Sequence, residues 1–233
     1  PRRARRTMSP GRWAVKLYVD TADIGEIEEA ARWGVLGGCT TNPTLLAKAG
    51  HTDPEVALRK ICAIVPGPVS MEVIATDTQG MVEEGRTYAS WAPNIVVKCP
   101  CTPEGLAATA ALARERIPVN MTLVFSPAQA ILAAEAGAAF VSPFLGRLDD
   151  VAADGMRVLR DVCEIYRAQG YRTEVLAASL RHPMHVVEAA RAGAHIATMP
   201  FGVLQQLVRH PLTDLGLERF LADWRALQRG PGA

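Results

Sequence analysis

Eight short runs of apolar, often β-branched residues recur along the chain, and a stretch with helical spacing follows each run. Such runs are typical of buried strands, and their alternation with helices predicts a parallel sheet covered by helices. The expected strands are residues 16–20, 38–42, 69–75, 95–100, 119–124, 140–144, 174–179 and 195–200. Eight units in about 200 residues predict an α/β fold, a closed (β/α)8 TIM barrel. An open doubly wound sheet is the alternative, but no glycine-rich phosphate loop follows any run.

Helix start and stop signals fill the segments between the runs. Thr102 and Ser126 each place a capping hydroxyl directly before a proline, a combination that favours a helix start. Gly137, Gly170 and Gly193 each follow a helical stretch, where a left-handed residue often ends the helix. These signals support the same alternation of strand and helix.

We expect three segments in the chain. Residues 1–15 carry five arginines and no acidic residue, and we interpret them as a basic, disordered N-terminal extension. Such an arm can bind nucleic acid, but the extension is the favoured interpretation and nucleic acid is not expected as a partner. Residues 16–224 form the single barrel, including an additional C-terminal helix over 213–224. Residues 225–233 form a short flexible tail.

Composition and residue spacing exclude several classes of protein. Hydrophobic residues make up 49% of the chain and charged residues 21%, which is globular composition. No apolar run approaches the roughly 20 residues of a membrane-spanning helix, so no membrane partner is expected. The five cysteines show no disulfide framework, which favours a cytoplasmic location. Histidines and cysteines do not cluster at ligand spacing, so we expect no metal and no cofactor.

Polar residues interrupt the apolar runs, mostly toward the carboxyl-terminal half of each run. A parallel strand buried on both faces should be almost entirely apolar, and the active sites of barrels lie at the carboxyl ends of the strands. The interrupting residues are Asp20, Asn42, Glu72, Lys98, Asn120, Thr122, Ser142 and Ser179. We therefore expect a polar site at that end of the barrel.

Lys98 is the most informative of these residues. Lysine is rarely buried, and burial lowers the pKa of its ammonium group, which leaves an amine able to attack a carbonyl. Asp20 and Glu72 supply carboxylates for the proton transfers that such chemistry requires. The alternative is a structural lysine paired with a carboxylate, with Asp20 in a turn or cap. The convergence of polar residues favours catalysis.

Two arginines follow the sixth and seventh runs. Arg147 and Arg181 each lie near a serine, and arginine with hydroxyl groups binds phosphate well. Surface ion pairs are the alternative for each arginine alone. His182 and His185, in the next helix entry, are interpreted as structural.

Six segments, taken in order, resemble the small transaldolases and their relatives, the fructose-6-phosphate aldolases. They are LYVDTAD at 17–23, TTNPT at 40–44, VVKCP at 96–100, NMTLVFS at 120–126, SPFLGR at 142–147 and ASLR at 178–181. The resemblance covers residues 16–224.

The resemblance implies roles for these residues. Lys98 matches the Schiff-base lysine, and Asp20 matches the acid/base that helps to cleave the carbon–carbon bond. Glu72 and Thr122 match the pair that holds a catalytic water. The residues that match groups binding the dihydroxyacetone hydroxyls or orienting the lysine are Asn42, Asn120 and Ser142. Those that match the phosphate site are Arg147, Ser179 and Arg181. The family uses no metal and no cofactor, and its small members assemble as pentamers or decamers in which the C-terminal helix packs on a neighbour.

The implied function is that of a transaldolase of the pentose phosphate pathway. It moves a dihydroxyacetone unit from sedoheptulose 7-phosphate to glyceraldehyde 3-phosphate, which yields erythrose 4-phosphate and fructose 6-phosphate. The related aldolases carry tyrosine where Phe144 stands and glutamine where Glu72 stands, which favours transaldolase. A fructose-6-phosphate aldolase and a non-catalytic sugar-phosphate-binding barrel are the alternatives. The cysteines beside Lys98, Cys99 and Cys101, raise the hypothesis of an oxidation-sensitive site.

Overall fold

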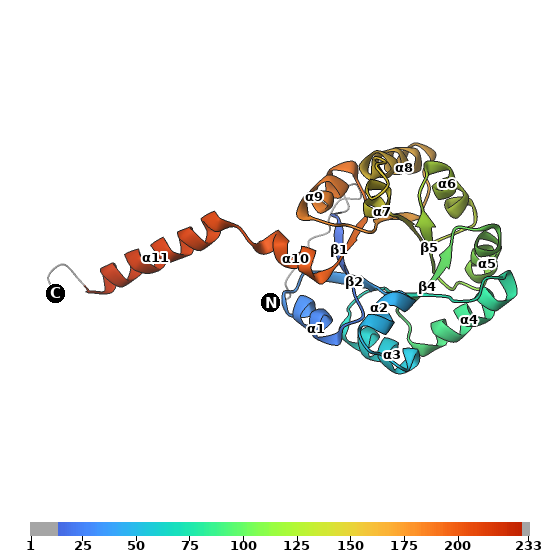
Figure 1. Ribbon diagram of the computed structural model, residues 1–233, viewed down its shortest axis with the longest axis horizontal. Helices are drawn as coiled ribbons and strands as arrows, with labels where there is room; N and C mark the ends of the chain where they lie inside the picture. The colour runs from blue at the N-terminus through green and yellow to red at the C-terminus, as the bar shows by residue number, and fades with distance from the viewer. Residues whose placement is uncertain (1–13, 230–233) are drawn as a thin grey trace, which may run out of the picture.

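The computed structural model describes residues 14–229 of the chain. Eight parallel strands close into a barrel in sequence order, and helices surround it (Figure 1). The strands are β1 (Lys16–Asp20), β2 (Leu36–Thr40), β3 (Val69–Glu72), β4 (Ile95–Pro100), β5 (Val119–Val124), β6 (Phe140–Pro143), β7 (Glu174–Ala177) and β8 (Ile196–Met199). The predicted (β/α)8 barrel is confirmed.

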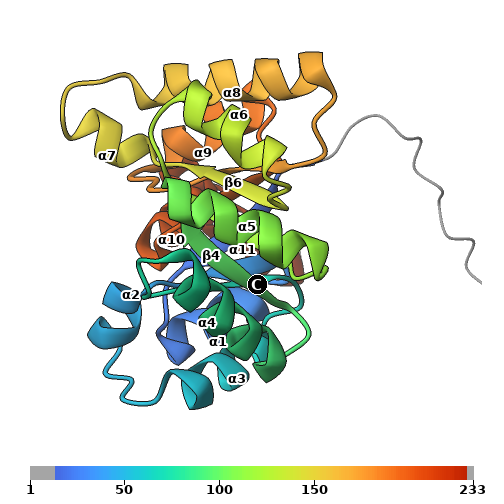
Figure 2. The ribbon, with the colours of Figure 1, turned by 90° about the vertical axis from the view of Figure 1, so that its right-hand side faces the viewer.

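Five of the strands are followed by one helix, and β2, β6 and β8 are each followed by two. The helices are α1 (Ile24–Arg32), α2 (Pro43–Lys48), α3 (Pro54–Ile64), α4 (Thr78–Trp91), α5 (Pro103–Arg114), α6 (Pro127–Glu135), α7 (Leu145–Asp149), α8 (Gly155–Gln169), α9 (Pro183–Ala192), α10 (Phe201–Val208) and α11 (Pro211–Arg229). The short helices α2 and α7 directly follow the carboxyl ends of their strands and lie on the same side of the barrel in Figure 2. They help to form the mouth of the barrel.

The predicted caps are present. Thr102 and Ser126 accept a hydrogen bond from a backbone N–H three residues later at the starts of α5 and α6. Gly170 and Gly193 end α8 and α9 in the left-handed conformation, and Gly137 after α6 has a φ of 84°. The helix boundaries thus follow local chemistry that the sequence carries.

The core lies between the outer face of the strands and the helices. Leu58, Val97, Leu112 and Leu159 are fully buried there, and each such side chain stabilises the fold by about 1.5–3 kcal/mol. A second apolar cluster that includes Tyr18 and Leu176 fills the barrel interior. The barrel is therefore packed below its mouth, which confines any site to the carboxyl ends of the strands.

The strand register places the central polar residues at one level. Glu72 on β3 is opposite Lys98 on β4, and Lys98 is opposite Asn120 on β5. Because side chains two residues apart share a face, Thr122 lies on the same face as Asn120 and nearer the mouth. Three adjacent strands thus present one polar layer.

Several strands end earlier than predicted. β2 ends at Thr40 because Asn42 caps α2, where its side chain accepts a hydrogen bond from the N–H of Leu45. β3 ends at Glu72; the N–H of Val73 still donates to the backbone oxygen of Lys98, but the N–H groups of Ile74 and Ala75 donate to the carboxylate of Glu84. Side chains therefore replace the neighbouring strand as hydrogen-bond partners at these points.

The C-terminal helix is longer than predicted and projects away from the barrel (Figure 1). α11 runs over Pro211–Arg229, whereas the prediction was 213–224 with a flexible tail from 225. Residues 225–229 contain no glycine or proline that would end a helix, and the first such residue is Gly230. The predicted extension over 1–15 falls almost wholly outside the described residues, as do residues 230–233 of the predicted tail.

Candidate active site

A cavity of about 490 Å³ opens at the carboxyl ends of the strands. Its volume suits a small organic ligand. Nine of the predicted site residues line it: Asp20, Asn42, Glu72, Lys98, Ser142, Phe144, Arg147, Ser179 and Arg181. The structure therefore brings together residues that the sequence spreads over six strand ends.

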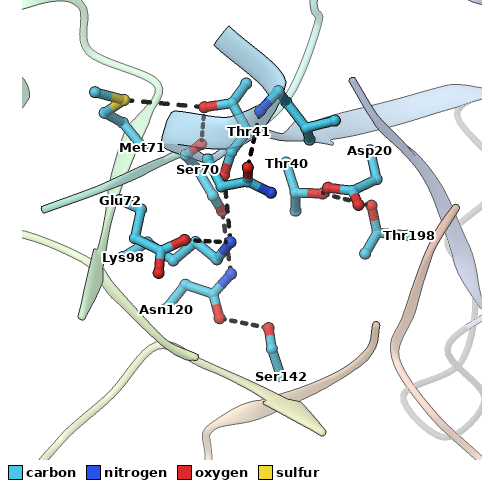
Figure 3. A network of polar contacts seen from close by, with 12 residues as sticks. Asp20, Thr40, Thr41, Ser70, Met71, Glu72, Lys98, Asn120, Ser142 and Thr198 are labelled. Atoms are coloured by element: carbon cyan, nitrogen blue, oxygen red, sulfur yellow. Dashed lines mark hydrogen bonds and ion pairs between the residues drawn. The ribbon is translucent and has the colours of Figure 1, made fainter. Parts of the chain in front are cut away.

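Lys98 lies at the floor of this cavity and is only 4% exposed. Its Nζ is 3.0 Å from Oε2 of Glu72 and donates a hydrogen bond of 3.3 Å to the backbone oxygen of Thr41 (Figure 3). Glu72 is the more exposed partner, at 18%. A buried amine next to a carboxylate has a local acceptor for its proton, which is the requirement for a nucleophilic lysine.

Asp20 lies on the other side of the polar network from Lys98 and Glu72, as Figure 3 shows. Oγ1 of Thr40 donates a 2.6 Å hydrogen bond to its carboxylate, and the Thr198 hydroxyl is 2.7 Å from Thr40. Because Thr40 gives its only proton to Asp20, Thr198 donates to Thr40. Burial raises the pKa of Asp20, while the charge of Lys98 and the bond from Thr40 lower it. A carboxyl group with a raised pKa suits acid/base exchange.

Asn120 and Thr122 are fully buried and do not line the cavity. The Ser142 hydroxyl donates a 2.6 Å hydrogen bond to Asn120, whose amide donates to the Ser70 hydroxyl at 3.1 Å. The buried Oγ1 of Thr122 has no hydrogen-bond partner among residues 14–229. Buried polar atoms are usually satisfied, so this hydroxyl is available for a water or a substrate group.

The two arginines lie at the rim of the cavity. The guanidinium of Arg147 on α7 is 4.8 Å from the centre of the Phe144 ring. Nη2 of Arg181 is 2.6 Å from Oδ2 of Asp150. Ser179 adopts a left-handed backbone conformation with a φ of 58°, just after the end of β7. These cationic and hydroxyl groups form a patch that can bind an anion such as phosphate.

Three residues of the site are not among those predicted from the sequence. Thr40 and Thr198 support Asp20, and Lys48 lies on the rim of the cavity. Thr198 is a polar residue within the eighth apolar run. The criterion that identifies the polar residues of the other seven runs therefore applies to Thr198 too. Lys48 carries no such signal, because a lysine on a helix surface is common.

The cysteines beside Lys98 are poor redox centres. Cys99 is fully buried, and burial raises the pKa of its thiol to about 12. Burial also raises the pKa of Cys101. Since the thiolate is the form that reacts with oxidants, these two environments argue against the hypothesis of an oxidation-sensitive site.

The described residues contain neither a candidate metal site nor a membrane-spanning helix. Between residues 14 and 229, no three His, Cys, Asp or Glu side chains are grouped so that they could hold a metal ion. Within the same range, no helix is long and apolar enough to span a membrane.

Comparison with known proteins identifies close relatives. A profile of the Transaldolase/Fructose-6-phosphate aldolase family matches residues 17–229. A protein of Roseiflexus castenholzii named "Probable transaldolase" is 56% identical over 216 residues, which are 93% of this chain and 100% of that protein. Proteins of the same name from Hydrogenobaculum sp. and Aquifex aeolicus are 54% and 52% identical, each over 93% of this chain and 100% of theirs.

A distantly related solved structure shares the barrel. A mandelate oxidase mutant with an FMN adduct superposes with a TM-score of 0.57 at 15% identity, over 80% of this chain. The chain spans 65% of that protein's length. A likeness at this level shows the fold and does not extend to chemistry. The profile and the relatives, in contrast, cover nearly the whole chain, which therefore belongs to the transaldolase/fructose-6-phosphate aldolase family of enzymes.

Proposed function

We propose that this enzyme is a transaldolase that carries a dihydroxyacetone unit between sugar phosphates as a Schiff base on Lys98. The observation that carries the proposal is the 3.0 Å contact of Lys98 with Glu72 at the floor of a cavity that arginines border. The reaction converts sedoheptulose 7-phosphate and glyceraldehyde 3-phosphate into erythrose 4-phosphate and fructose 6-phosphate. This places the enzyme in the pentose phosphate pathway.

The first stage forms the Schiff base. Glu72 accepts a proton from the ammonium of Lys98, and the free amine attacks the C2 carbonyl of the ketose donor. The resulting carbinolamine loses its hydroxyl as water and becomes a protonated imine. A water held by Glu72 and the free hydroxyl of Thr122 can carry protons in this stage.

The second stage breaks the carbon–carbon bond. The Asp20 carboxylate takes the proton of the C4 hydroxyl, the C3–C4 bond breaks, and its electron pair moves toward the imine to form an enamine on Lys98. The remaining aldose phosphate leaves. An acceptor aldose phosphate then enters, and the enamine carbon attacks its aldehyde carbon to form the new carbon–carbon bond. Asp20 returns the proton to the aldehyde oxygen, and hydrolysis of the imine by water frees the new ketose and Lys98. The raised pKa of Asp20 supports both directions of this exchange.

The phosphate group supplies binding energy away from the reacting carbons. Arg147, Arg181 and Ser179 line the same cavity as Lys98, on its rim. A phosphate held there fixes the position of the sugar chain relative to the amine. Asn42 and Ser142 line the cavity too and are the proposed partners of the dihydroxyacetone hydroxyls, with Asn120 orienting Ser142.

A fructose-6-phosphate aldolase is the second candidate within the family. It would release free dihydroxyacetone because water protonates the enamine before an acceptor arrives. Phe144 lines the cavity and its ring cannot donate a hydrogen bond, so it does not help to place such a water. This favours transfer over release. A non-catalytic binding barrel would need the arginines but has no use for a buried Lys98–Glu72 pair.

The proposal extends to location and assembly. All five cysteines are unpaired, as expected in the reducing cytoplasm. No residue of α11 is buried, although the helix exposes large apolar side chains that include Phe220 and Trp224. We therefore propose that α11 packs on a neighbouring subunit in a homo-oligomer, a pentamer or decamer by resemblance to the family.

A turnover assay tests the function. The enzyme is incubated with fructose 6-phosphate, with and without erythrose 4-phosphate, and the products are measured by mass spectrometry. A transaldolase forms sedoheptulose 7-phosphate only when the acceptor is present. Free dihydroxyacetone without acceptor at a comparable rate would identify an aldolase, and no product in either mixture would reject both. The Lys98→Met variant is the control for background reaction.

A further inference from the structure

A buried histidine lies directly behind the arginine rim of the cavity. His185, in the first turn of α9, is only 6% exposed. Its Nδ1 accepts a 3.2 Å hydrogen bond from the backbone N–H of Arg181. Its Nε2 is 3.1 Å from Oδ2 of Asp149. Since Nδ1 accepts, the ring proton is on Nε2 and is donated to Asp149.

The two partners of the ring belong to the two segments that carry the rim arginines. Arg181 follows β7, whereas Asp149 is the last residue of α7, the five-residue helix that also contains Arg147. The other oxygen of Asp149, Oδ1, accepts a 3.0 Å hydrogen bond from the N–H of Gly155. The carboxylate is thus held at both oxygens, and His185 joins α7 to the segment after β7.

These two segments are in direct backbone contact. The N–H of Gly146 in α7 donates to the backbone oxygen of Ser179 at 2.9 Å. A Cβ at position 146 would lie 2.3 Å from that oxygen, so only glycine allows this approach. Arg181 also reaches Asp150 with its guanidinium. The relative placement of Arg147 and Arg181 therefore depends on a small set of contacts, to which His185 contributes a buried side chain.

The surroundings of the ring favour its neutral form. Burial lowers the pKa of His185, as does the neighbouring His182, whose ring centre is 3.8 Å away. Asp149 and Glu188 act in the opposite direction. Arg160 of α8 has its Nη1 3.9 Å from Oε2 of Glu188. A neutral ring keeps Nδ1 free to accept the N–H of Arg181.

We propose that His185 is a positioning residue that holds Arg147 and Arg181 in register for the phosphate group of the substrate. The proposal rests on the proposed function, because it takes the arginine rim as the phosphate site. Arginine binds phosphate through several aligned hydrogen bonds, so a shift of one arginine relative to the other weakens binding. Loss of the His185 bridge should affect the affinity for phosphate and leave the chemistry at Lys98 intact.

Two conservative variants separate the two bonds of the ring. In His185→Asn the side-chain oxygen replaces Nδ1 and keeps the acceptor for Arg181. In His185→Gln the amide nitrogen replaces Nε2 and keeps the donor to Asp149, but the acceptor for Arg181 is lost. His195 offers a matched control at the opposite end of the barrel, since its Nδ1 accepts a 3.0 Å bond from the N–H of Val175. His195→Asn and His195→Gln make the same two changes there.

Each variant is assayed with fructose 6-phosphate and erythrose 4-phosphate, and its binding of inorganic phosphate is measured by calorimetry. We expect His185→Gln to raise the KM for fructose 6-phosphate and the Kd for inorganic phosphate in parallel, by about 3- to 10-fold, the effect of one hydrogen bond. The kcat should stay within about twofold. His185→Asn, which breaks the bridge at Asp149 instead, should raise both constants by a similar factor, and the His195 variants should change neither constant.

Two results would overturn the proposal. One is an unchanged Kd for inorganic phosphate in His185→Gln. The other is an equal loss of affinity in the His185→Gln and His195→Gln variants, which would indicate a general structural effect. The calorimetric measurement needs no turnover, so it decides the proposal even if the wild-type enzyme fails the transaldolase assay. That failure would instead reject the proposed function.

Discussion

The ammonium of Lys98 lies 3.0 Å from the carboxylate of Glu72, and the two residues are register partners on adjacent strands. Lys98 is almost wholly buried, and Glu72 is mostly buried. Removing one member of such a pair leaves a buried charge without a partner, whereas removing both does not. Removing both residues should therefore restore the stability that is lost when Glu72 alone is removed, but it should not restore activity.

The first prediction concerns the stability of this pair. Glu72→Leu should lower the free energy of unfolding by about 3 kcal/mol, the low end for a buried pair because Glu72 is partly exposed. The double variant Glu72→Leu, Lys98→Met should regain most of this loss and remain inactive. Urea denaturation of the two variants and wild type gives the values. A double variant no more stable than Glu72→Leu would show that the ion pair is not the cause.

The second prediction concerns Asp20. Asp20→Asn keeps the acceptor for Thr40 but cannot exchange a proton, so kcat should fall by roughly 10²- to 10⁴-fold while the KM changes little. Steady-state kinetics measures both constants. Activity within a few-fold of wild type would remove Asp20 from the acid/base role.

The same variant has a predicted effect on stability. Because burial raises the pKa of Asp20 above 3.8, the folded state binds its proton more tightly than the unfolded state. This contribution to stability is complete below pH 3.8 and is lost as the pH rises through the raised pKa. Asp20→Asn should therefore be more stable than wild type at pH 7 and equal to it at low pH. Thermal unfolding across this range checks the sign, and a loss of stability at pH 7 would contradict it.

The third prediction concerns the arginine rim. Arg147→Met and Arg181→Met should each raise the KM for fructose 6-phosphate on the order of 10- to 100-fold, the effect of losing charged hydrogen bonds. Cleavage of unphosphorylated fructose should change little. Arg160→Met, at an exposed ion pair on α8, is the matched control. If both sugars are affected equally, the arginines do not bind the phosphate.

The fourth prediction concerns the choice between transfer and release. Phe144→Tyr adds a hydroxyl to a ring that lines the cavity, and this group can hold a water near the enamine. The ratio of released dihydroxyacetone to sedoheptulose 7-phosphate should increase severalfold. Phe125→Tyr is a matched control. The ring centres of Phe125 and Phe144 are 5.8 Å apart, but Phe125 does not line the cavity. An equal ratio in wild type, Phe144→Tyr and Phe125→Tyr would show that Phe144 does not determine whether the dihydroxyacetone unit is transferred or released.

The fifth prediction concerns α11. Replacing the exposed Leu217, Phe220 and Trp224 by serine removes apolar area that the barrel does not cover. The variant should sediment as a smaller species than wild type and keep its far-ultraviolet circular dichroism spectrum. An unchanged sedimentation coefficient would exclude this face of α11 from the subunit interface.

The barrel could be predicted from the sequence because its signals are local. Apolar runs, capping residues and terminal glycines each act within a few residues, and they fixed the order of the eight strands. The predicted strand ends are less accurate where a side chain competes with the hydrogen bonds between strands, as Asn42 does at the start of α2. The left-handed conformation of Ser179 gives no sequence signal either, because it occurs at a residue other than glycine.

Contacts between distant strands could not be predicted. The hydrogen bond between Thr40 and Thr198 joins residues 158 positions apart and exists because β8 pairs with β1 to close the barrel. The same applies to His185, for which the sequence indicates only a structural role. Its bridge to Asp149 depends on how α7 and α9 pack, and no local pattern specifies that packing.

The most direct test of the central claim is to trap the Schiff base. The enzyme is mixed with fructose 6-phosphate, reduced with borohydride, digested and mapped by mass spectrometry. The account predicts a dihydroxyacetone-derived adduct on Lys98 and none in the Lys98→Met variant. An adduct on another lysine, such as Lys48 on the rim of the cavity, or no adduct at all, would contradict it.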